Sequence, residues 1–405
     1  MAMFKGRRAE SDNGWTGYGP WPYTILDESD LAHHIERLAL VHTEGPTESL
    51  TIQPFPAPDK NQDRHTITQW NTPQGLWKVF SVFDGHAGHE TVDYANNNLI
   101  PALEAAVLSA QSSEPEDEKA VLEPSRVIEV LRKAVSSFDD NITQHFLQLF
   151  PGGPEVLSQL TDDEIRAVSM VDGRPHPAVQ PCIAGSTVLV ALLDPARQLY
   201  VVSLGDSIAI LGIKNDHGSQ WKAKLLSAFH NGLNPEEVQR LKRDHPDQPD
   251  VVTNGRVLGG IAVTRALGDH VFKLPSIYAD RVFRLACADS HIISKADGFL
   301  PRCLTPPYLL NDPDIVHVDL SKVSPADNVL LLASDGLGDL KDVHDKLPDP
   351  LAEHWVKIAA ESERPALSVL RDAMGGNDLE KASFWITVEM EEPWMDDTTI
   401  VVTRL

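Results

Sequence analysis

Four aspartates placed at the ends of apolar runs are the feature of this sequence that most constrains its fold. Asp63, Asp84, Asp335 and Asp396 each lie where an apolar run meets a turn, and more than 300 residues separate the first from the last. Only a folded domain can gather side chains so far apart in the chain. Because gathered carboxylates repel each other and lose hydration, hard divalent cations bound through oxygen are their usual compensation. The pattern therefore predicts a hydrolase site that holds two metal ions.

The composition is that of a globular protein with a large core. The chain has 405 residues, 42 % hydrophobic and 23 % charged, which suits one domain with insertions or two domains. With 35 Lys and Arg against 59 Asp and Glu, the net charge is −24. Such a surface repels nucleic acid and anionic membranes, so no nucleic-acid partner is expected. The three cysteines are widely separated, which favours a reducing compartment with free thiols.

No part of the sequence predicts a membrane span. The longest apolar runs, residues 187–193 and 329–333, fall well short of the ~18 residues that a span requires. At the N-terminus, Lys5, Arg7 and Arg8 are followed at once by acidic residues, without the apolar core of a secretory signal. A mitochondrial presequence, already removed, stays an open alternative.

Local patterns predict a strand, two long helices and then a dense group of strands. Residues 76–83 are aromatic and β-branched, as in a half-buried strand, and they end at Asp84. Apolar spacing and capping residues predict helices over residues 90–107, 125–150 and 233–245, and two more within 350–374. Further strands are expected over residues 186–193, 198–203, 208–213, 329–333 and 399–403.

The connections between these strands indicate the fold class. Asp194–Pro195 and Gly205–Asp206 have turn chemistry, so the strands that they join are expected to form an antiparallel meander. Hairpin-connected strands with helices in separate stretches do not form βαβ units. An α+β layered domain is therefore expected.

The residues around Asp84 suggest the chemistry. Asp84, Gly85 and His86 place a carboxylate, an open carbonyl and an imidazole at one strand end. In isolation this triplet is more simply interpreted as a turn before a helix, but Asp335–Gly336 ends a second buried run in the same way. Asp84 is the candidate bridge between two cations, which together lower the pKa of a shared water and make it the nucleophile. His86 is the candidate general acid for the departing oxygen.

An ordered set of motifs resembles the metal-dependent serine/threonine protein phosphatases of type 2C. The motifs are NQDR (61–64), VFDGHAG (82–88), GST (185–187), LGDS (204–207), RVLGGIAVTRALGD (256–269), LASDGL (332–337) and DDTTIVV (396–402). Within that family the chain is most similar to the mitochondrial pyruvate dehydrogenase phosphatase branch, through FHNGLNPEEVQRLKRDHP (229–246), the long segment 270–305 and TPPYL (305–309).

The resemblance implies a fold of two stacked antiparallel β-sheets flanked by helices on both faces, an α-β-β-α sandwich, with Mg²⁺ or Mn²⁺ as cofactor, two per active site. Local composition indicates an N-terminal extension over residues 1–50 and an insertion at about 151–181. The resemblance implies a phosphatase domain over 51–405, with a second insertion at about 270–305. The metal ligands implied by matching position are Asp84, the Gly85 carbonyl, Asp335 and Asp396, with Asp63 and Gln62 beside them and Asp339 at a third, weaker metal.

Three departures from the family pattern bear on these roles. Gln62 stands where many members have a glutamate ligand, which removes one formal charge from the second metal, although Asp63 can compensate. The arginine that binds substrate phosphate in many members would fall near Pro58 and is missing here. Lys60 or Arg64 is expected to bind the phosphate instead. Cys182 lies where an aspartate ligand of the third metal is often found.

Three functions stay open at this point. The first is hydrolysis of phosphoserine and phosphothreonine on proteins, with a mitochondrial dehydrogenase complex as the substrate that the branch implies and the mitochondrial matrix as location, the cytosol being the alternative. The second is a catalytically impaired scaffold that binds phosphoproteins or a partner complex. The third is hydrolysis of small phosphate esters by the same metals.

Overall fold

A computed structural model describes residues 5–15, 17–56, 61–113, 122–215 and 220–405. The chain divides into two compact units. Unit 1 comprises residues 1–63, 208–225 and 323–405, and unit 2 comprises residues 64–207 and 226–322. Each unit contains one of the two large antiparallel sheets.

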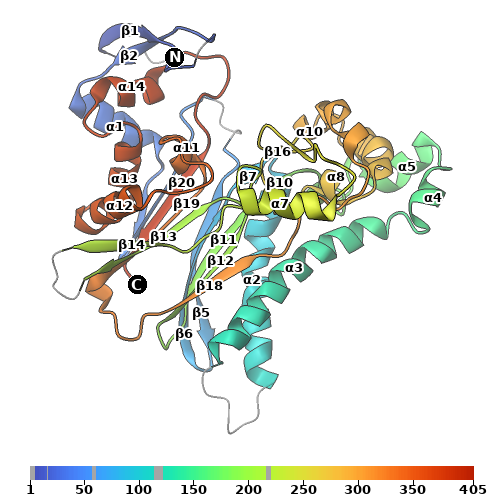
Figure 1. Cartoon of the computed structure of the whole chain (residues 1–405), viewed down its shortest axis with the longest axis horizontal. Coiled ribbons are helices and arrows are strands. Elements are labelled where there is room, and N and C mark those ends of the chain that lie inside the picture. The colour runs from blue at the N-terminus through green and yellow to red at the C-terminus, as the bar shows by residue number, and fades with distance from the viewer. Residues whose placement is uncertain (1–4, 16, 57–60, 114–121, 216–219) are drawn as a thin grey trace. The chain divides into compact units, whose positions relative to one another are not determined.

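Unit 1 is built on a six-stranded antiparallel sheet in the order β14-β13-β19-β20-β4-β3. The strands are β3 (His42–Glu44), β4 (Thr47–Ile52), β13 (Ile208–Lys214), β14 (Trp221–Leu225), β19 (Asn328–Ala333) and β20 (Thr398–Thr403). Every residue of β19 and β20 is buried, as expected of central strands built around the apolar runs 329–333 and 400–402. Helices α12 (Asp349–Glu361) and α13 (Pro365–Ala373) pack on this sheet (Figure 1).

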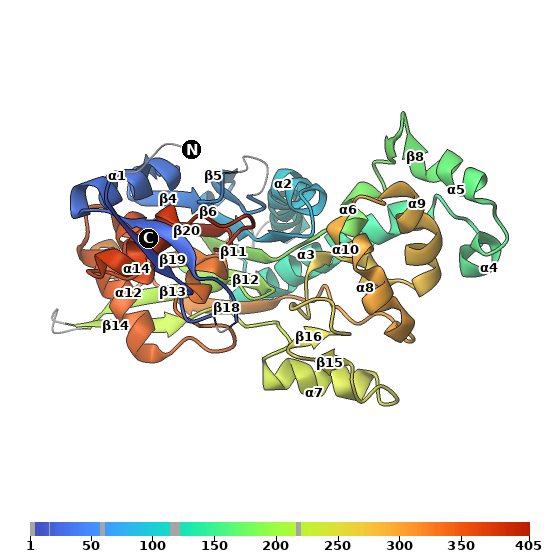
Figure 2. The same cartoon turned by 90° about the horizontal axis from the view of Figure 1, so that it is seen from above.

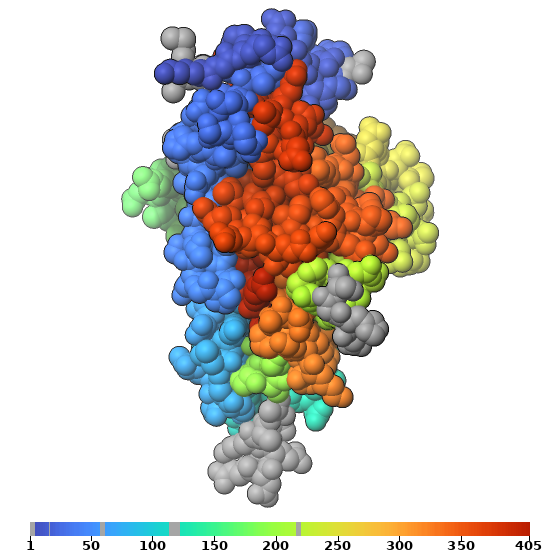
Figure 3. Space-filling view, turned by 90° about the vertical axis from the view of Figure 1, so that its left-hand side faces the viewer, coloured from blue at the N-terminus to red at the C-terminus, as the bar shows by residue number. Residues whose placement is uncertain are grey.

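The N-terminal residues of unit 1 pack against its last helix. The elements are β1 (Arg7–Ser11), β2 (Trp21–Ile25), α1 (Glu28–Leu38) and α14 (Leu379–Thr387). The backbone N–H groups of Thr24 and Leu26 donate to the hydroxyls of Thr387 and Ser383 at 2.9 and 3.0 Å. Figure 3 shows this blue N-terminal surface bordering the red C-terminal one.

Unit 2 is built on a five-stranded antiparallel sheet in the order β18-β12-β11-β6-β5, beside a short three-stranded sheet, β17-β10-β7. The strands are β5 (Arg64–Thr72), β6 (Gly75–Phe83), β7 (Gly85–His86), β10 (Gly185–Ser186), β11 (Val188–Leu193), β12 (Gln198–Leu204), β17 (Leu267–Gly268) and β18 (Asp314–Asp319). Helices α2 (Glu90–Ser113) and α3 (Pro124–Leu147) cover the larger sheet (Figure 1).

The two segments expected as insertions pack together within unit 2 (Figure 2). The first segment contains α4 (Gly153–Leu157), α5 (Asp162–Ser169), the hairpin of β8 (Met170–Val171) and β9 (Arg174–Pro175), and α6 (Gln180–Ile183). The second contains α8 (His270–Lys273), the π-helical η2 (Tyr278–Phe283), α9 (Arg284–Ala286), α10 (His291–Ser294) and the 3₁₀ turns η3 (Ala296–Gly298) and η4 (Leu300–Arg302). Helix α5 begins with a capping box of Thr161 and Glu164 and buries Ile165 against its neighbours.

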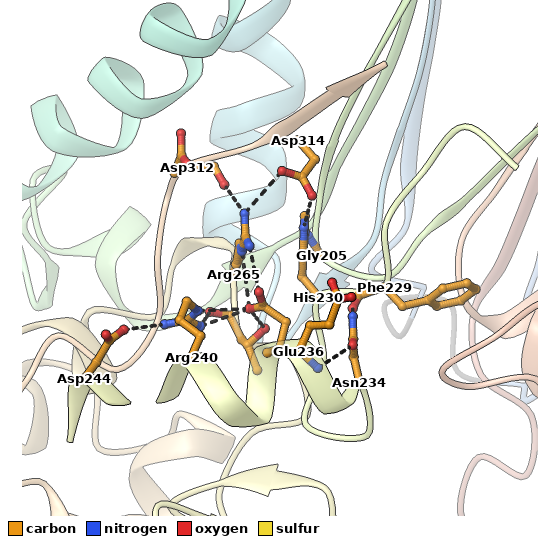
Figure 4. A network of polar contacts seen from close by, with 12 residues as sticks. Gly205, Phe229, His230, Asn234, Glu236, Arg240, Asp244, Arg265, Asp312 and Asp314 are labelled. Atoms are coloured by element: carbon orange, nitrogen blue, oxygen red, sulfur yellow. Dashed lines mark hydrogen bonds and ion pairs between the residues drawn. The ribbon is translucent and has the colours of Figure 1, made fainter. Parts of the chain in front are cut away.

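Helix α7 (Pro235–Asp244) is held to unit 2 by a buried polar network (Figure 4). Glu237 is 4 % exposed and accepts hydrogen bonds from Arg265, Arg240 and Thr264 at 2.6, 3.0 and 2.6 Å. Burial alone would raise the pKa of Glu237, but these hydrogen bonds outweigh it and lower the pKa to about 2. A carboxylate shared by two guanidinium groups therefore anchors the helix.

The segment before α7 is fixed in the same way. The buried His230 accepts a hydrogen bond from the backbone N–H of Gly205 at Nδ1 (3.2 Å), and its Nε2 lies 3.1 Å from Asp314 Oδ2 on β18 (Figure 4). Two small hairpin strands, β15 (Val252–Thr253) and β16 (Arg256–Val257), follow the helix. The polar contacts thus tie residues 229–244 to the five-stranded sheet.

The structure confirms the α+β class with antiparallel sheets, and the predicted strands and helices named above are all present. The predicted meander is confirmed at its first connection, because β11 pairs with β12, and is wrong at its second, because β13 pairs with β14 and β19 in the other sheet. The connection between β12 and β13 is not an exposed hairpin turn. Asp206 and Ser207 are buried there and bind the side chains of Asn231 and Thr187.

In the described part of the chain, no helix combines the length and the apolar character that crossing a bilayer requires.

Candidate active site

In unit 2, Asp84, Gly85 and His86 directly follow β6, as the sequence predicted. The backbone N–H of Asp84 donates to Thr187 Oγ1 at 3.1 Å, and the N–H of Thr187 donates to the Asp84 carbonyl at 2.9 Å. Thr187 Oγ1 in turn lies 2.9 Å from Ser207 Oγ. These bonds fix the backbone at Asp84.

His86 has a buried carboxylate partner that sequence reasoning missed. His86 lies on β7, which pairs with β10, and β10 pairs with β17. The residue after β17 is Asp269, whose Oδ2 lies 2.7 Å from His86 Nε2. The His86 side chain is 28 % exposed and that of Asp269 is 1 % exposed. The imidazole therefore reaches solvent while one of its nitrogens is bound inside the protein.

A second carboxylate, Asp206, lies near enough to His86 to feel its charge. Burial raises the pKa of Asp206, while the hydrogen bond from Asn231 and the nearby charge of His86 act to lower it. Asp206 and Asp269 both lie in motifs that carry the family resemblance, LGDS and RALGD. Those motifs were the available signal for both residues, but nothing in the sequence pairs either of them with His86.

In unit 1, Asp63 is buried against the end of β19. Ser334 Oγ donates to Asp63 Oδ2 at 2.7 Å and accepts from the backbone N–H of Thr399 on β20 at 2.8 Å. Burial, together with the nearby carboxylates of Asp397 and Asp396, raises the pKa of Asp63 to about 7, although the hydrogen bond from Ser334 acts to lower it. Asp63, Ser334 and the segment 396–397 are thus neighbours, although more than 250 residues of chain lie between Asp63 and Ser334.

Gln62 and Asp396 belong to the same cluster. The backbone N–H of Gln62 donates to Asp397 Oδ2 at 2.6 Å, and the Gln53 amide donates to Asp397 Oδ1 at 2.8 Å. The N–H of Asp397 donates to Asp396 Oδ1 at 2.9 Å. Asp397 therefore serves as the hydrogen-bonding anchor that holds its neighbours, a role that the sequence did not separate from that of Asp396.

Asp335 and Asp339 lie at the two ends of the short helix α11 (Gly336–Asp339). A Cβ at Gly336 would lie 2.2 Å from the Asp397 carbonyl oxygen, so a glycine is required where the chain leaves β19. This close approach brings Asp335 next to the segment 396–397. Asp339, 41 % exposed, pairs with His344 at 3.0 Å.

The chemistry of these donors fits hard divalent cations. Among the described residues, no three His, Cys, Asp or Glu side chains form a ready-made metal-binding group. The cluster of unit 1 nevertheless offers only oxygen donors, and the carboxylates of Asp397 and Asp396 act to raise the pKa of the buried Asp63. A bound cation would relieve that repulsion, and Mg²⁺ and Mn²⁺ prefer such oxygen donors.

Of the two residues expected to hold substrate phosphate, Lys60 lies outside the described residues. Arg64, at the start of β5, pairs with Asp93 of α2 through Nε at 2.8 Å, and its Nη2 lies 3.3 Å from His89 Nδ1. Binding of a phosphate by Arg64 would therefore compete with Asp93. Cys182, at the position discussed for a third metal, is fully buried, and burial raises the pKa of its thiol well above the ordinary value. A thiol in that state is a poor metal ligand.

Comparison with known proteins identifies a family. The family model described as protein phosphatase 2C matches residues 57–347. The chain is 27 % identical over 339 residues to pyruvate dehydrogenase (acetyl-transferring) phosphatase 2, a mitochondrial protein of Homo sapiens, with 75 % of this chain and 62 % of that protein covered. It is 28 % identical over 284 residues to a protein phosphatase 2C homologue of Schizosaccharomyces pombe, with 69 % and 57 % covered.

These matches span somewhat less than two thirds of either relative's own length. Among solved structures, the serine-threonine phosphatase 2C of Toxoplasma gondii aligns with a TM-score of 0.50 at 17 % identity, covering 90 % of this chain and 96 % of that one. At this identity the likeness concerns the fold.

Proposed function

Because the chain belongs to the protein phosphatase 2C family, we propose that it hydrolyses phosphoserine and phosphothreonine on proteins. The proposal rests on the position of His86. This residue follows Asp84 after the end of β6, is partly exposed to solvent and contacts the buried carboxylate of Asp269. A positioned imidazole next to a carboxylate is suited to proton transfer. The buried, oxygen-only cluster around Asp63 supports metal dependence.

Two Mg²⁺ or Mn²⁺ ions would be held by Asp84, the Gly85 carbonyl, Asp335 and Asp396, with Asp63 and Gln62 beside them and Asp339 assigned to a third, weaker ion. When bound, such ions activate a water for attack on phosphorus and offset the charge of the phosphate. Thr187 and Ser207 hold the backbone at Asp84, and Ser334 holds Asp63. In each unit, hydrogen bonds thus fix the candidate ligands before any ion binds.

His86 donates a proton to the serine or threonine oxygen as the bond to phosphorus breaks. An alkoxide is a poor leaving group in water, so a proton donor at this oxygen lowers the barrier. Arg64 binds the phosphate when it leaves Asp93, and its planar guanidinium can make two parallel hydrogen bonds to phosphate oxygens. Lys60 is the second candidate for this role.

Release of phosphate from a phosphoserine peptide tests the proposal. The purified protein should turn the peptide over with millimolar Mn²⁺ or Mg²⁺ and stop when a chelator is added. Comparison with a small aryl phosphate tests hydrolysis of small esters, since a protein phosphatase should favour the peptide. No release of phosphate from the peptide at millimolar metal would rule the activity out.

The relatives named as mitochondrial pyruvate dehydrogenase phosphatases support a dehydrogenase complex as the substrate and the mitochondrion as the location. Fractionation of the protein with the mitochondrial matrix, and removal of phosphate from that complex by the purified protein, test these two points. Recovery in the cytosol would contradict the location.

A scaffold that binds phosphoproteins without hydrolysing them is the second candidate. It is favoured by Gln62 in place of a glutamate, by the pairing of Arg64 with Asp93 and by the buried Cys182. Calorimetry with Mn²⁺ separates the two functions, because a scaffold should bind fewer than two equivalents. In a scaffold, Asp84→Asn should also leave binding of a phosphopeptide intact while no turnover is seen in the parent protein.

A further inference from the structure

We propose that Asp269 is a positioning residue that holds His86 in the orientation from which it delivers a proton to the leaving oxygen. The inference rests on the proposed function, because it assigns a partner to the general acid of that reaction. Its basis is the 2.7 Å contact between Asp269 Oδ2 and His86 Nε2.

The buried charge of Asp269 points to His86 as its counterpart. The side chain is 1 % exposed, and a carboxylate in that state is costly unless a donor compensates it. Within the described residues, Oδ1 of Asp269 has no hydrogen-bond partner, and His86 is the side chain that donates to Oδ2. The imidazole is therefore the group that stabilises this carboxylate, and the carboxylate in turn favours an N–H at Nε2.

The fold keeps a space open for this pair. Gly185 of β10 lies between β7 and β17, and a Cβ built on it would lie 2.1 Å from both His86 Nε2 and Asp269 Oδ2. The missing side chain at position 185 is what lets the imidazole and the carboxylate meet.

Asp269 is itself held on both sides. Its N–H donates to the Ala184 carbonyl at 2.9 Å, and its backbone has the left-handed conformation, with φ 51° and ψ 37°. The N–H of Gly268, the residue before it, donates to the buried Asp139 at 2.8 Å, and Asp139 is neutralised by Lys273 at 2.6 Å. A carboxylate fixed in this way can orient an imidazole with little freedom of its own.

The geometry assigns the two ring nitrogens. Since Asp269 binds Nε2, the proton for the substrate comes from Nδ1. As water adds to phosphorus, the bond from phosphorus to the serine oxygen breaks and its electron pair stays on that oxygen. The oxygen takes the Nδ1 proton, and serine and inorganic phosphate are released. The neutral imidazole is then protonated again from solvent. Without Asp269, the ring could turn and the proton would no longer be aimed at this oxygen.

Dependence on the leaving group tests the proposal. A phosphoserine peptide needs the proton, whereas p-nitrophenyl phosphate releases a stable anion and needs it little. Asp269→Asn should therefore lower kcat about 10- to 100-fold on the peptide, which is part of the roughly 10²- to 10⁴-fold that a positioned general acid contributes. On p-nitrophenyl phosphate it should change kcat less than about threefold. In a His86→Ala background, Asp269→Asn should add no further loss on the peptide.

A second variant covers the case in which Asp269→Asn does not fold. Gly185→Ala places its methyl group where the ends of the two side chains lie, so the imidazole and the carboxylate must move apart, and the variant should show the same preference for p-nitrophenyl phosphate. Asp372→Asn is the matched control, because it breaks a His–Asp contact of 2.9 Å with His354 in unit 1 and should leave the ratio of the two rates unchanged.

Two results would overturn the proposal. Equal losses on both substrates would show that Asp269 has a structural role alone, while the activity of the parent protein would still support the phosphatase assignment. No turnover of either substrate by the parent protein would instead remove the proposed function, and the role of Asp269 with it.

Discussion

Lys273 Nζ lies 2.6 Å from Asp139 Oδ2, and the two side chains are 8 % and 1 % exposed. Asp139 also accepts a hydrogen bond from the backbone N–H of Gly268, the residue before Asp269. Removing one member of a buried pair leaves an uncompensated charge, which costs about 3–5 kcal/mol. Lys273→Met should therefore lower the free energy of unfolding by about that amount in urea denaturation.

The control for this variant is Lys222→Met, which breaks an exposed pair with Glu353 and should cost less than about 1 kcal/mol. Equal free energies of unfolding for Lys273→Met and the parent protein would show that Asp139 is not a buried ionised carboxylate that depends on Lys273.

His270 should make stability depend on pH between about 4 and 6.5. Burial lowers the pKa of His270 from 6.5 to about 4, although the nearby Asp139 acts to raise it. The unfolded chain therefore binds more protons in this window, and the free energy of unfolding should fall as the pH falls from 6.5 towards 4. His270→Gln, which can keep the contact with Thr143, should flatten this slope in urea titrations.

The same substitution at the exposed His33 is the control and should leave the slope as it is. A slope that persists in His270→Gln would assign the effect to other groups.

Arg64 and Asp93 should have opposite effects on substrate binding. Arg64→Gln removes a charged hydrogen bond to phosphate worth roughly 1.5–3 kcal/mol, so KM for a phosphopeptide should rise about tenfold or more. Asp93→Asn releases Arg64 from its ion pair and should lower KM. Arg126→Gln, which breaks an exposed pair with Glu129 on α3, should change neither KM nor kcat. An unchanged KM in both site variants would leave Lys60 as the phosphate-binding residue.

Glu237 should anchor α7 through its charge. Glu237→Gln leaves Arg240 and Arg265 without their shared carboxylate, so the free energy of unfolding should fall by about 3–5 kcal/mol. Amide hydrogen exchange should increase first in residues 229–244. The neighbouring Glu236→Gln, at an exposed position of the same helix, is the control. If amide exchange in residues 229–244 increased no more than elsewhere in both variants, Glu237 would not hold this segment locally.

Elements with local signals could be predicted from the sequence. Helix α7 begins with Asn234 accepting from the N–H of Glu236 and with Pro235 in its first turn, as the capping pattern predicted. Strand β6 was readable from its aromatic and β-branched residues. Strands β4 and β5 were missed, because both contain several polar residues. One partner of β4, strand β20, lies at the far end of the chain, whereas β5 forms a hairpin with β6.

Long-range relationships could not be predicted in this way. The turn chemistry at Gly205–Asp206 indicated a hairpin, but Asp206 and Ser207 bind Asn231 and Thr187 and direct the chain into another sheet. Asp269 and His86 lie 183 residues apart, and their contact depends on a glycine in a third segment. Asp397 likewise differs from Asp396 through its bonds to Gln53 and Gln62, which no local pattern reveals.

Titration calorimetry with Mn²⁺ measures how many ions the protein binds. If carboxylates from separate parts of the chain hold two ions together, the parent protein should bind two equivalents, and both Asp84→Asn and Asp335→Asn should lose metal and activity. Glu44→Gln, on an exposed strand residue, should bind as the parent does. Two equivalents retained in both aspartate variants, or none bound by the parent protein, would show that these aspartates do not hold the metal ions.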